Sequence, residues 1–315
     1  MDAISEFLAA APQQLVLGLS LGSLYALIAV GYTVVYGIVQ LINFAHGEVF
    51  MIGAFGALST YVLLFKGTTS LWALPVMIVG AMIVAVLTAV LMERVAYRPL
   101  RNAPRLAPLI TAIGISVFLQ EFIRLFYGKV PGFSDAKSRI PFPSIEGVTG
   151  APIPFLGLSL QRPALFTIGC LVVCGVFLWY FITHTKSGRA MQAVSQDPDT
   201  ARLMGIDVDR IIVIAFAIGA ALAAVAGVAQ GLQNNNIDFR MGFMAGLKAF
   251  TAAVLGGIGN VPGAIVGGLT LGVVEAFAAM YVGSSWKDIV AFSLLILVLV
   301  FRPQGLLGAR VVDRA

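Results

Sequence analysis

The densest group of chemically versatile residues lies at 186–210, in the segment KSGRAMQAVSQDPDTARLMGIDVDR. It carries acids, bases and hydroxyl groups, yet no spacing typical of a nucleophile, a metal site or a phosphate loop. Apolar runs without Asp, Glu, Lys or Arg flank it at 163–183 and 211–231. Each run has about the ~20 residues that a helix needs to cross a hydrocarbon core. The chemistry expected here is therefore recognition by a small folded element at a membrane surface.

The central part of this segment predicts a short capped helix. Asp197 can cap it, Pro198 suits its first position and Asp199 favours its positive end. Gly205 can end it in a left-handed conformation. Asp207 or Asp209 can then cap the span that follows.

Such a helix has two interpretations. It either fits into a groove on a soluble cytoplasmic partner or lies on the lipid surface as an amphipathic connector. Its mixed charges and its lack of large aromatic anchors favour the partner. The candidate coupling residues are Asp197, Pro198, Asp199, Arg202, Leu203 and Gly205.

Two further polar groups lie near membrane spans. Asn43 can cap a helix whose third residue is His46, with Glu48 near the same positive end. This group is either a capped helix end or part of a substrate path. Glu275 lies on an expected span, where an ionisable group marks a functional site by default. It can also lie near the outer end, hydrogen-bonded to polar groups.

A glycine-rich stretch precedes Glu275. Residues 249–274, AFTAAVLGGIGNVPGAIVGGLTLGVV, carry seven glycines and no charge. The part GGIGNVPG breaks a helix, because Gly and Pro leave its hydrogen-bond ladder incomplete. It is either a broken helix beside a translocation path or a tight turn between two crossings, with glycines for close packing. The candidate path residues are Asn43, His46, Glu48, Gly256, Gly257, Gly259, Asn260, Pro262 and Glu275.

The composition indicates an integral membrane protein. Charged residues are 11% and hydrophobic residues 59% of the 315 residues, whereas soluble domains carry about 25% charge. We expect one all-α transmembrane domain over 1–315, with about eight or nine spans and broken glycine-rich segments. The expected apolar regions are 14–36, 43–65, 71–92, 106–127, 163–184, 211–231, 246–282 and 287–301.

The basic loops predict the orientation. Residues 93–105 carry four Arg against one Glu, and short loops rich in Lys and Arg stay in the cytoplasm. The same rule places the loop at about 185–210 and the tail from Arg302 inside. Residues 128–162 then form an outer loop, and the N-terminus lies outside a bacterial inner membrane.

The sequence lacks the motifs of several function classes. It contains no GxxxxGK[ST] or HExxH motif, so we expect neither ATP binding nor enzyme chemistry, and no cofactor or metal. The net charge of +5 follows from the basic loops and needs no nucleic acid. Only Glu275 clearly qualifies as an intramembrane ionisable group, which argues against an ion-driven carrier. Glu121 and Arg124 are expected to pair on one helix face.

Three blocks resemble a known family. They are residues 22–55, GSLYALIAVGYTVVYGIVQLINFAHGEVFMIGAF, residues 188–210 and residues 249–275; the ending FRPQGLLG at 301–308 also fits. They closely resemble the branched-chain amino-acid permeases of ATP-binding-cassette importers, the LivH type. The wider permease class has a loop pattern of Glu-Ala-Ala, three residues, then Gly. Here Asp199, Thr200, Ala201 and Gly205 keep its spacing, with two replacements.

The resemblance implies a heteromeric importer in the lipid bilayer. It implies a second homologous permease, two cytoplasmic ATPases and a solute-binding protein outside that delivers leucine, isoleucine, valine or a similar amino acid. Related permeases carry amides, urea or aromatic amino acids, so the exact cargo stays open. A motor-independent secondary carrier or channel for small polar solutes is the alternative.

Overall fold

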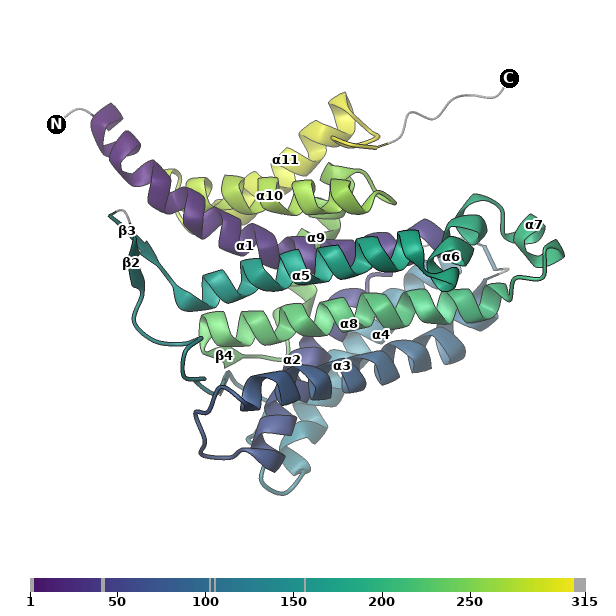
Figure 1. The fold of residues 1–315 in the computed structure, drawn as a ribbon, viewed down its shortest axis with the longest axis horizontal. Coiled ribbons are helices and arrows are strands. Elements are labelled where there is room, and N and C mark those ends of the chain that lie inside the picture. The colour runs from purple at the N-terminus through teal and green to yellow at the C-terminus, as the bar shows by residue number, and fades with distance from the viewer. Residues whose placement is uncertain (1–2, 41–42, 102, 105, 156, 309–315) are drawn as a thin grey trace.

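The chain folds into a helical bundle in which the long helices lie side by side (Figure 1). The computed structural model describes residues 3–40, 43–101, 103–104, 106–155 and 157–308. The α-helices are α1 (Ala3–Val39), α2 (His46–Leu64), α3 (Ala73–Met92), α4 (Leu106–Phe126), α5 (Arg162–His184), α6 (Lys186–Gln196), α7 (Pro198–Leu203), α8 (Val208–Asn234), α9 (Met241–Gly256), α10 (Val261–Tyr281) and α11 (Lys287–Phe301). The expected all-α class is confirmed.

The remaining elements are short. A π-helical turn at Glu93–Tyr97 and a 3-10 turn at Arg98–Leu100 extend α3, and another 3-10 turn, Tyr127–Lys129, follows α4. Strand β1 (Ile140–Pro141) pairs antiparallel with β4 (Asn236–Ile237), with Ile140 opposite Ile237. Strands β2 (Ile153–Phe155) and β3 (Leu158–Leu160) form a hairpin.

Seven helical segments of the described chain are long and apolar enough to span a membrane: Ala10–Val39, His46–Leu64, Ala73–Leu100, Leu106–Lys129, Arg162–His184, Val208–Asn234 and Val261–Tyr281. Helices α9 and α11 have 16 and 15 residues. At 1.5 Å per residue they reach about 24 and 22 Å, less than the ~30 Å hydrocarbon core. The expected count of eight or nine spans is therefore not confirmed.

The region at 246–282 contains two helices joined by a turn. Helix α9 ends at Gly256 and α10 begins at Val261, with Gly257 and Gly259 at φ +108° and +92° between them. These values favour glycine. Of the two interpretations, the structure therefore has a turn between two helices and not a single broken helix. Helix α9 is nevertheless shorter than a full crossing.

Glycines bring α1 and α10 into close contact. Gly18 and Gly22 on α1 are four residues apart, as are Gly268 and Gly272 on α10. A Cβ added at Gly22 would lie 2.7 Å from the Cα of Leu269, so no side chain fits there. Such small-residue pairs let membrane helices approach closely. Gly268 and Gly272 therefore have the packing role that one of the two interpretations gave to the glycines of this stretch.

The bundle has two distinct ends (Figure 1). The strand end carries the strands and residues 128–155, and Gln13 on α1 exchanges hydrogen bonds of 3.1 and 3.0 Å with the backbone of Ser159 there. The α7 end carries α6, α7 and the turn between α9 and α10. Residues 302–308 bind at the α7 end, since Asn260 donates to the Leu307 carbonyl at 2.7 Å. Arg98 and Arg101 pair with Asp209 at the start of α8, so the described parts of the three basic segments share one end of the molecule.

Buried residues concentrate on α1, α2, α8 and α9, whereas α3, α4 and α5 expose long apolar faces. Val79 and Leu87 on α3 and Val173 on α5 are examples of exposed apolar side chains. In a membrane protein these faces contact lipid, because hydrocarbon is their favourable surroundings. Helix α4 also carries the exposed pair of Arg124 with Glu121, as expected from their spacing.

Candidate functional site

The short helix α7 is capped at both ends as the sequence indicates. The Asp197 side chain accepts hydrogen bonds from the backbone N–H groups of Asp199 and Thr200, at 3.0 and 3.1 Å. Pro198 is its first residue. Gly205 has φ +83° and donates to the Arg202 carbonyl at 3.0 Å. A further hydrogen bond of 3.0 Å from the Ile206 N–H to the Ala201 carbonyl completes a Schellman motif.

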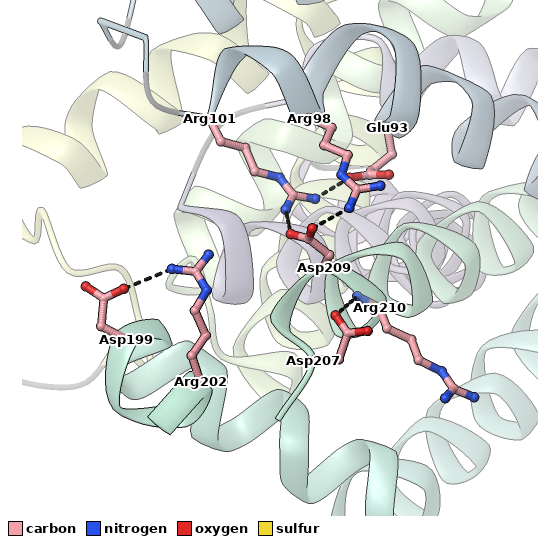
Figure 2. Close-up of polar contacts among 8 residues, drawn as sticks. All are labelled: Glu93, Arg98, Arg101, Asp199, Arg202, Asp207, Asp209 and Arg210. Carbon is pink, nitrogen blue, oxygen red and sulfur yellow. Dashed lines mark hydrogen bonds and ion pairs between the residues drawn. The ribbon is translucent and has the colours of Figure 1, made fainter. Parts of the chain in front are cut away.

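Helix α7 projects from the bundle beside α6 (Figure 1), and the caps fix its two ends. Asp199 and Arg202 pair at 2.9 Å on its solvent side (Figure 2). Leu203 and Met204 are 88% and 78% exposed. Helix α7 and the residue after it thus present two large exposed apolar side chains beside an exposed ion pair.

Hydrogen bonds of the Asp197 side chain also set its charge state. The Thr200 hydroxyl and the backbone N–H groups of Thr200 and Asp199 hold the pKa of the Asp197 carboxyl below its ordinary value. Donors that bind the charged form favour it. The cap is therefore an ionised carboxylate at neutral pH.

The start of α8 is joined to the segment after α3. Asp207 caps α8 by accepting from the Arg210 N–H at 3.1 Å. Asp209 instead pairs with both Arg98 and Arg101 (Figure 2). Arg101 in turn pairs with Glu93, whose side chain is fully buried. The sequence interpretation used the 93–105 loop only as a sign of orientation and missed this connection.

The group at Asn43, His46 and Glu48 is buried and was partly misassigned. Helix α2 begins at His46 with Ala45 at its cap position, so Asn43 is not the side-chain cap. The Asn43 side chain accepts from the Tyr97 hydroxyl at 2.6 Å instead. Asn43 and His46 line an internal cavity of about 10 Å³, room for about one water.

Glu48 lies inside the bundle, away from that cavity. Its Oε1 accepts hydrogen bonds from Ser116 at 3.0 Å and from Gln120 at 2.7 Å, both on α4. Its Oε2 has no hydrogen-bond partner among the described residues. The polar contacts join α2 to α4, so Glu48 has a packing role whatever else it does.

Glu275 is buried within α10 and belongs to an ion-pair network. Its Oε1 lies 2.6 Å from Nζ of Lys248 on α9, and its Oε2 accepts from the Tyr25 hydroxyl at 2.8 Å. Lys248 also pairs with Asp288 at 2.7 Å. The sequence interpretation singled out Glu275, and the structure adds Lys248 on α9 and Glu48 on α2 to the buried ionisable groups. A scarcity of buried charge is thus no argument against a carrier.

The glycine-rich turn holds the end of the described chain. Gly256 and Leu255 accept backbone hydrogen bonds from Leu307 and Leu306, at 3.0 and 2.8 Å. Asn260 caps α10 by accepting from the Gly263 N–H at 3.4 Å. Pro262 lies in the first turn of α10.

Among the described residues, two cavities of similar volume lie at opposite ends of the bundle, and a third of about 550 Å³ is lined in part by Pro198 and Arg202. One of about 690 Å³ at the strand end includes Glu275 in its wall. Another of about 660 Å³ at the α7 end is lined by Gly259, Asn260 and Pro262. Gly256, Gly257 and Glu48 line neither. Helices α1 and α10 border both cavities, whereas the candidate path residues on helices lie on α2, α9 and α10 and the others lie in the segments before α2 and α10.

Residues 14–299 match the family described as "Branched-chain amino acid transport system / permease component". The chain is 46% identical to the high-affinity branched-chain amino acid transport system permease protein BraD of Pseudomonas aeruginosa, over 96% of this chain and 97% of that protein. It is 44% identical to the corresponding permease protein LivH of Escherichia coli K12, with the same coverage.

Two solved structures share the fold at low sequence identity. PsaBC from Streptococcus pneumoniae, in complex with Fab, has a TM-score of 0.52 at 13% identity and covers 96% of this chain and 97% of that one. An inward-facing putative metal-chelate type ABC transporter has a TM-score of 0.50 at 16% identity, over 96% and 91%. These two show the architecture alone. With the match over residues 14–299 and the two relatives above 40% identity, the chain belongs to the family of permease components of branched-chain amino acid transport systems.

Proposed function

We propose that this protein is the membrane-spanning permease subunit of an ATP-binding-cassette importer for branched-chain or related amino acids. Its relatives in Pseudomonas aeruginosa and Escherichia coli are named as high-affinity permeases of such systems, and the match covers 97% of each. Large cavities at both ends, bordered by α1 and α10, support a route for a small solute.

The observation that carries the coupling assignment is the exposed surface of α7. Leu203 and Met204 project from a helix whose ends are fixed by Asp197 and Gly205. A rigid helix loses little conformational freedom on binding, which favours affinity for a groove. We assign that groove to a cytoplasmic ATPase. The candidate coupling residues remain Asp197, Pro198, Asp199, Arg202, Leu203 and Gly205.

The proposed orientation follows from this contact. The α7 end faces the cytoplasm, where ATP is available, and the strand end faces outward. The N-terminus then lies outside and residues 302–308 inside, in keeping with the basic segments at the α7 end. A second homologous permease, two ATPases and an outer solute-binding protein complete the assembly.

Force on α7 passes into the bundle through two connections. Only a few residues separate α7 from α8. The pairs of Asp209 with Arg98 and Arg101 then link the first turn of α8 to the segment after α3. A ligand moves a two-state equilibrium only through a difference in affinity for the two states. We assign that difference to how tightly the ATP-bound motor holds α7 in each state.

The alternative is a motor-independent carrier or channel. The buried charges Glu48, Lys248 and Glu275 are compatible with ion coupling. A motor-independent carrier would not need the exposed surface of α7 to bind a cytoplasmic partner, and this favours the importer. Dependence on ATP separates the two functions directly.

The test uses proteoliposomes that hold both permeases and both ATPases, with the binding protein outside. Leucine uptake should require ATP inside. Replacing both Asp199 and Arg202 by Ala, or Gly205→Pro, should leave insertion intact and lower uptake per ATP hydrolysed. Replacing Asp135 and Lys137 by Ala removes a similar exposed pair, at 3.4 Å, from the strand end as a control.

Co-purification of the ATPases should be measured on the same samples. The coupling assignment is wrong if both α7 variants keep wild-type uptake and wild-type co-purification. ATP-independent uptake by this polypeptide alone would instead establish the carrier.

A further inference from the structure

The strand-end cavity of about 690 Å³ combines charged groups with an apolar wall. It lies between α1, α8, β4, α9 and α10, beside the buried pair of Lys248 and Glu275. Cavities that bind small molecules are typically apolar with a few placed polar groups. The chemistry of the lining therefore indicates what kind of molecule fits.

The most deeply buried charged groups of the cavity pair with one another. Glu275 binds Lys248 and Tyr25, and Lys248 also binds Asp288. Lys287 lies 3.8 Å from Glu275. These groups give the cavity a polar floor, and a ligand would have to displace an existing ion pair to use them.

Nearer the mouth, the charged groups have no ionic partner. Arg139 beside β1 and Arg240 before α9 both line the cavity, and neither pairs with a carboxylate anywhere in the described part of the chain. Arg240 lies over the Phe239 ring at 5.0 Å. Asp238 accepts the Arg240 backbone N–H at 2.8 Å through Oδ1, which leaves Oδ2 for another donor. Two cations and one carboxylate are thus available to a ligand.

Part of the cavity wall is apolar. It is formed by Leu21 and Leu24 on α1 and by Met241, Met244 and Ala245 on α9. Met adapts its shape to different apolar groups. This wall is suited to branched aliphatic side chains of more than one shape.

We propose that this cavity binds a free aliphatic amino acid as a zwitterion, an inference that rests on the proposed import function. Arg240 and Arg139 bind the α-carboxylate, because guanidinium groups match carboxylates with paired hydrogen bonds. Asp238 binds the α-ammonium group. Leu24 and Met244 contact the side chain. The permease thus recognises the backbone of its cargo after the binding protein has released it.

The test is saturation-transfer NMR on the complete permease–ATPase complex in nanodiscs, without binding protein. Three probes are compared: leucine, 4-methylpentanoate, which lacks the amino group, and 3-methylbutylamine, which lacks the carboxylate. Leucine should bind at least tenfold more tightly than either probe. A site that reads both charges of the zwitterion loses affinity when either charge is missing.

Two variants assign the charges. Arg240→Gln should weaken leucine binding at least tenfold and leave 3-methylbutylamine unchanged. Asp238→Asn keeps an acceptor for the Arg240 N–H; it should weaken leucine and leave 4-methylpentanoate unchanged. Lys66→Gln is the control. It removes an exposed cation at the strand end that does not line the cavity, and it should leave the binding of all three probes unchanged.

The proposal is overturned by absence of saturable leucine binding, by equal binding of the three probes, or by unchanged leucine binding in both variants. ATP-driven leucine uptake by the same complex, with binding protein added, separates the two assignments. Uptake without saturable binding rejects this site alone, and absence of ATP-driven uptake rejects the proposed function.

Discussion

The carboxylate of Asp209 pairs with the guanidinium of Arg101, and this contact joins the first turn of α8 to the segment after α3 (Figure 2). Arg101 is shared, because its other terminal nitrogen pairs with the buried Glu93. One arginine thus neutralises a buried carboxylate and links it to the helix that follows α7. Arg101 therefore contributes both to the stability of the fold and to the proposed coupling.

Arg101→Met should destabilise the folded protein by about 3–5 kcal/mol, because it leaves Glu93 buried without a cation. The measurement is thermal or denaturant unfolding in detergent. As a control, Arg94→Met removes an exposed arginine from the turn that contains Glu93 and should change stability by no more than about 0.5 kcal/mol. Equal stability of the two variants would show that Glu93 does not depend on Arg101.

Gly272→Leu should prevent normal packing of α1 against α10. A Cβ at Gly272 would collide with the backbone of Gly22, and overpacking costs about 1–3 kcal/mol or more. Gly114→Leu is the matched control, since Gly114 is also helical but has no atom within 4 Å of an added Cβ. Yield of folded protein by size-exclusion chromatography measures both. Similar yields would contradict the close helix contact.

Lys248→Met should destabilise the protein by about 3–5 kcal/mol, because Glu275 would keep a buried charge with its closest cation removed. Changing Lys248 and Glu275 together to Met should recover most of that loss, since a buried pair replaced by apolar groups is often neutral. Unfolding midpoints of the wild type, the Lys248→Met and Glu275→Met single variants and the double variant form a double-mutant cycle. Additive losses would mean that the two side chains do not depend on each other.

The Asp197 cap should make the order of α7 depend on pH only in acid. Its pKa is lowered, mainly by the Thr200 hydroxyl, so the stabilisation is complete above the ordinary value of 3.8 and is lost as the pH falls through the lowered value. Amide hydrogen exchange of residues 199–204, corrected for intrinsic rates, should not change between neutral pH and about that value. Asp197→Asn should remove the acid transition. A transition near neutral pH would contradict an ionised cap.

Local signals made α7 predictable from sequence. Asp197, Pro198 and Gly205 each act on backbone within a few residues, and helix caps depend on such local chemistry. The assignment of Asn43 as a cap failed because the same short polar residue can bind a distant partner, here Tyr97. The preference of Asn for cap positions does not tell whether its side chain caps the helix or binds a distant partner.

Contacts between distant segments were the part that sequence did not reveal. Lys248 and Glu275 are 27 residues apart and meet only because the turn at residues 257–260 folds α9 back on α10. A signal was present, since ionisable groups of opposite sign in neighbouring apolar segments tend to pair. The pairing of Asp209 with Arg98 and Arg101 spans more than 100 residues, and nothing in the local pattern indicates it.

The most direct test of the coupling account is labelling of a single thiol at Leu203. In a chain with Cys170→Ala and Cys174→Ala, Leu203→Cys is its only cysteine. A membrane-impermeant maleimide should not label it in intact cells, should label it in inside-out vesicles without the ATPases, and should be blocked when the ATPases are bound. Labelling in intact cells, or labelling unaffected by the ATPases, would contradict the account.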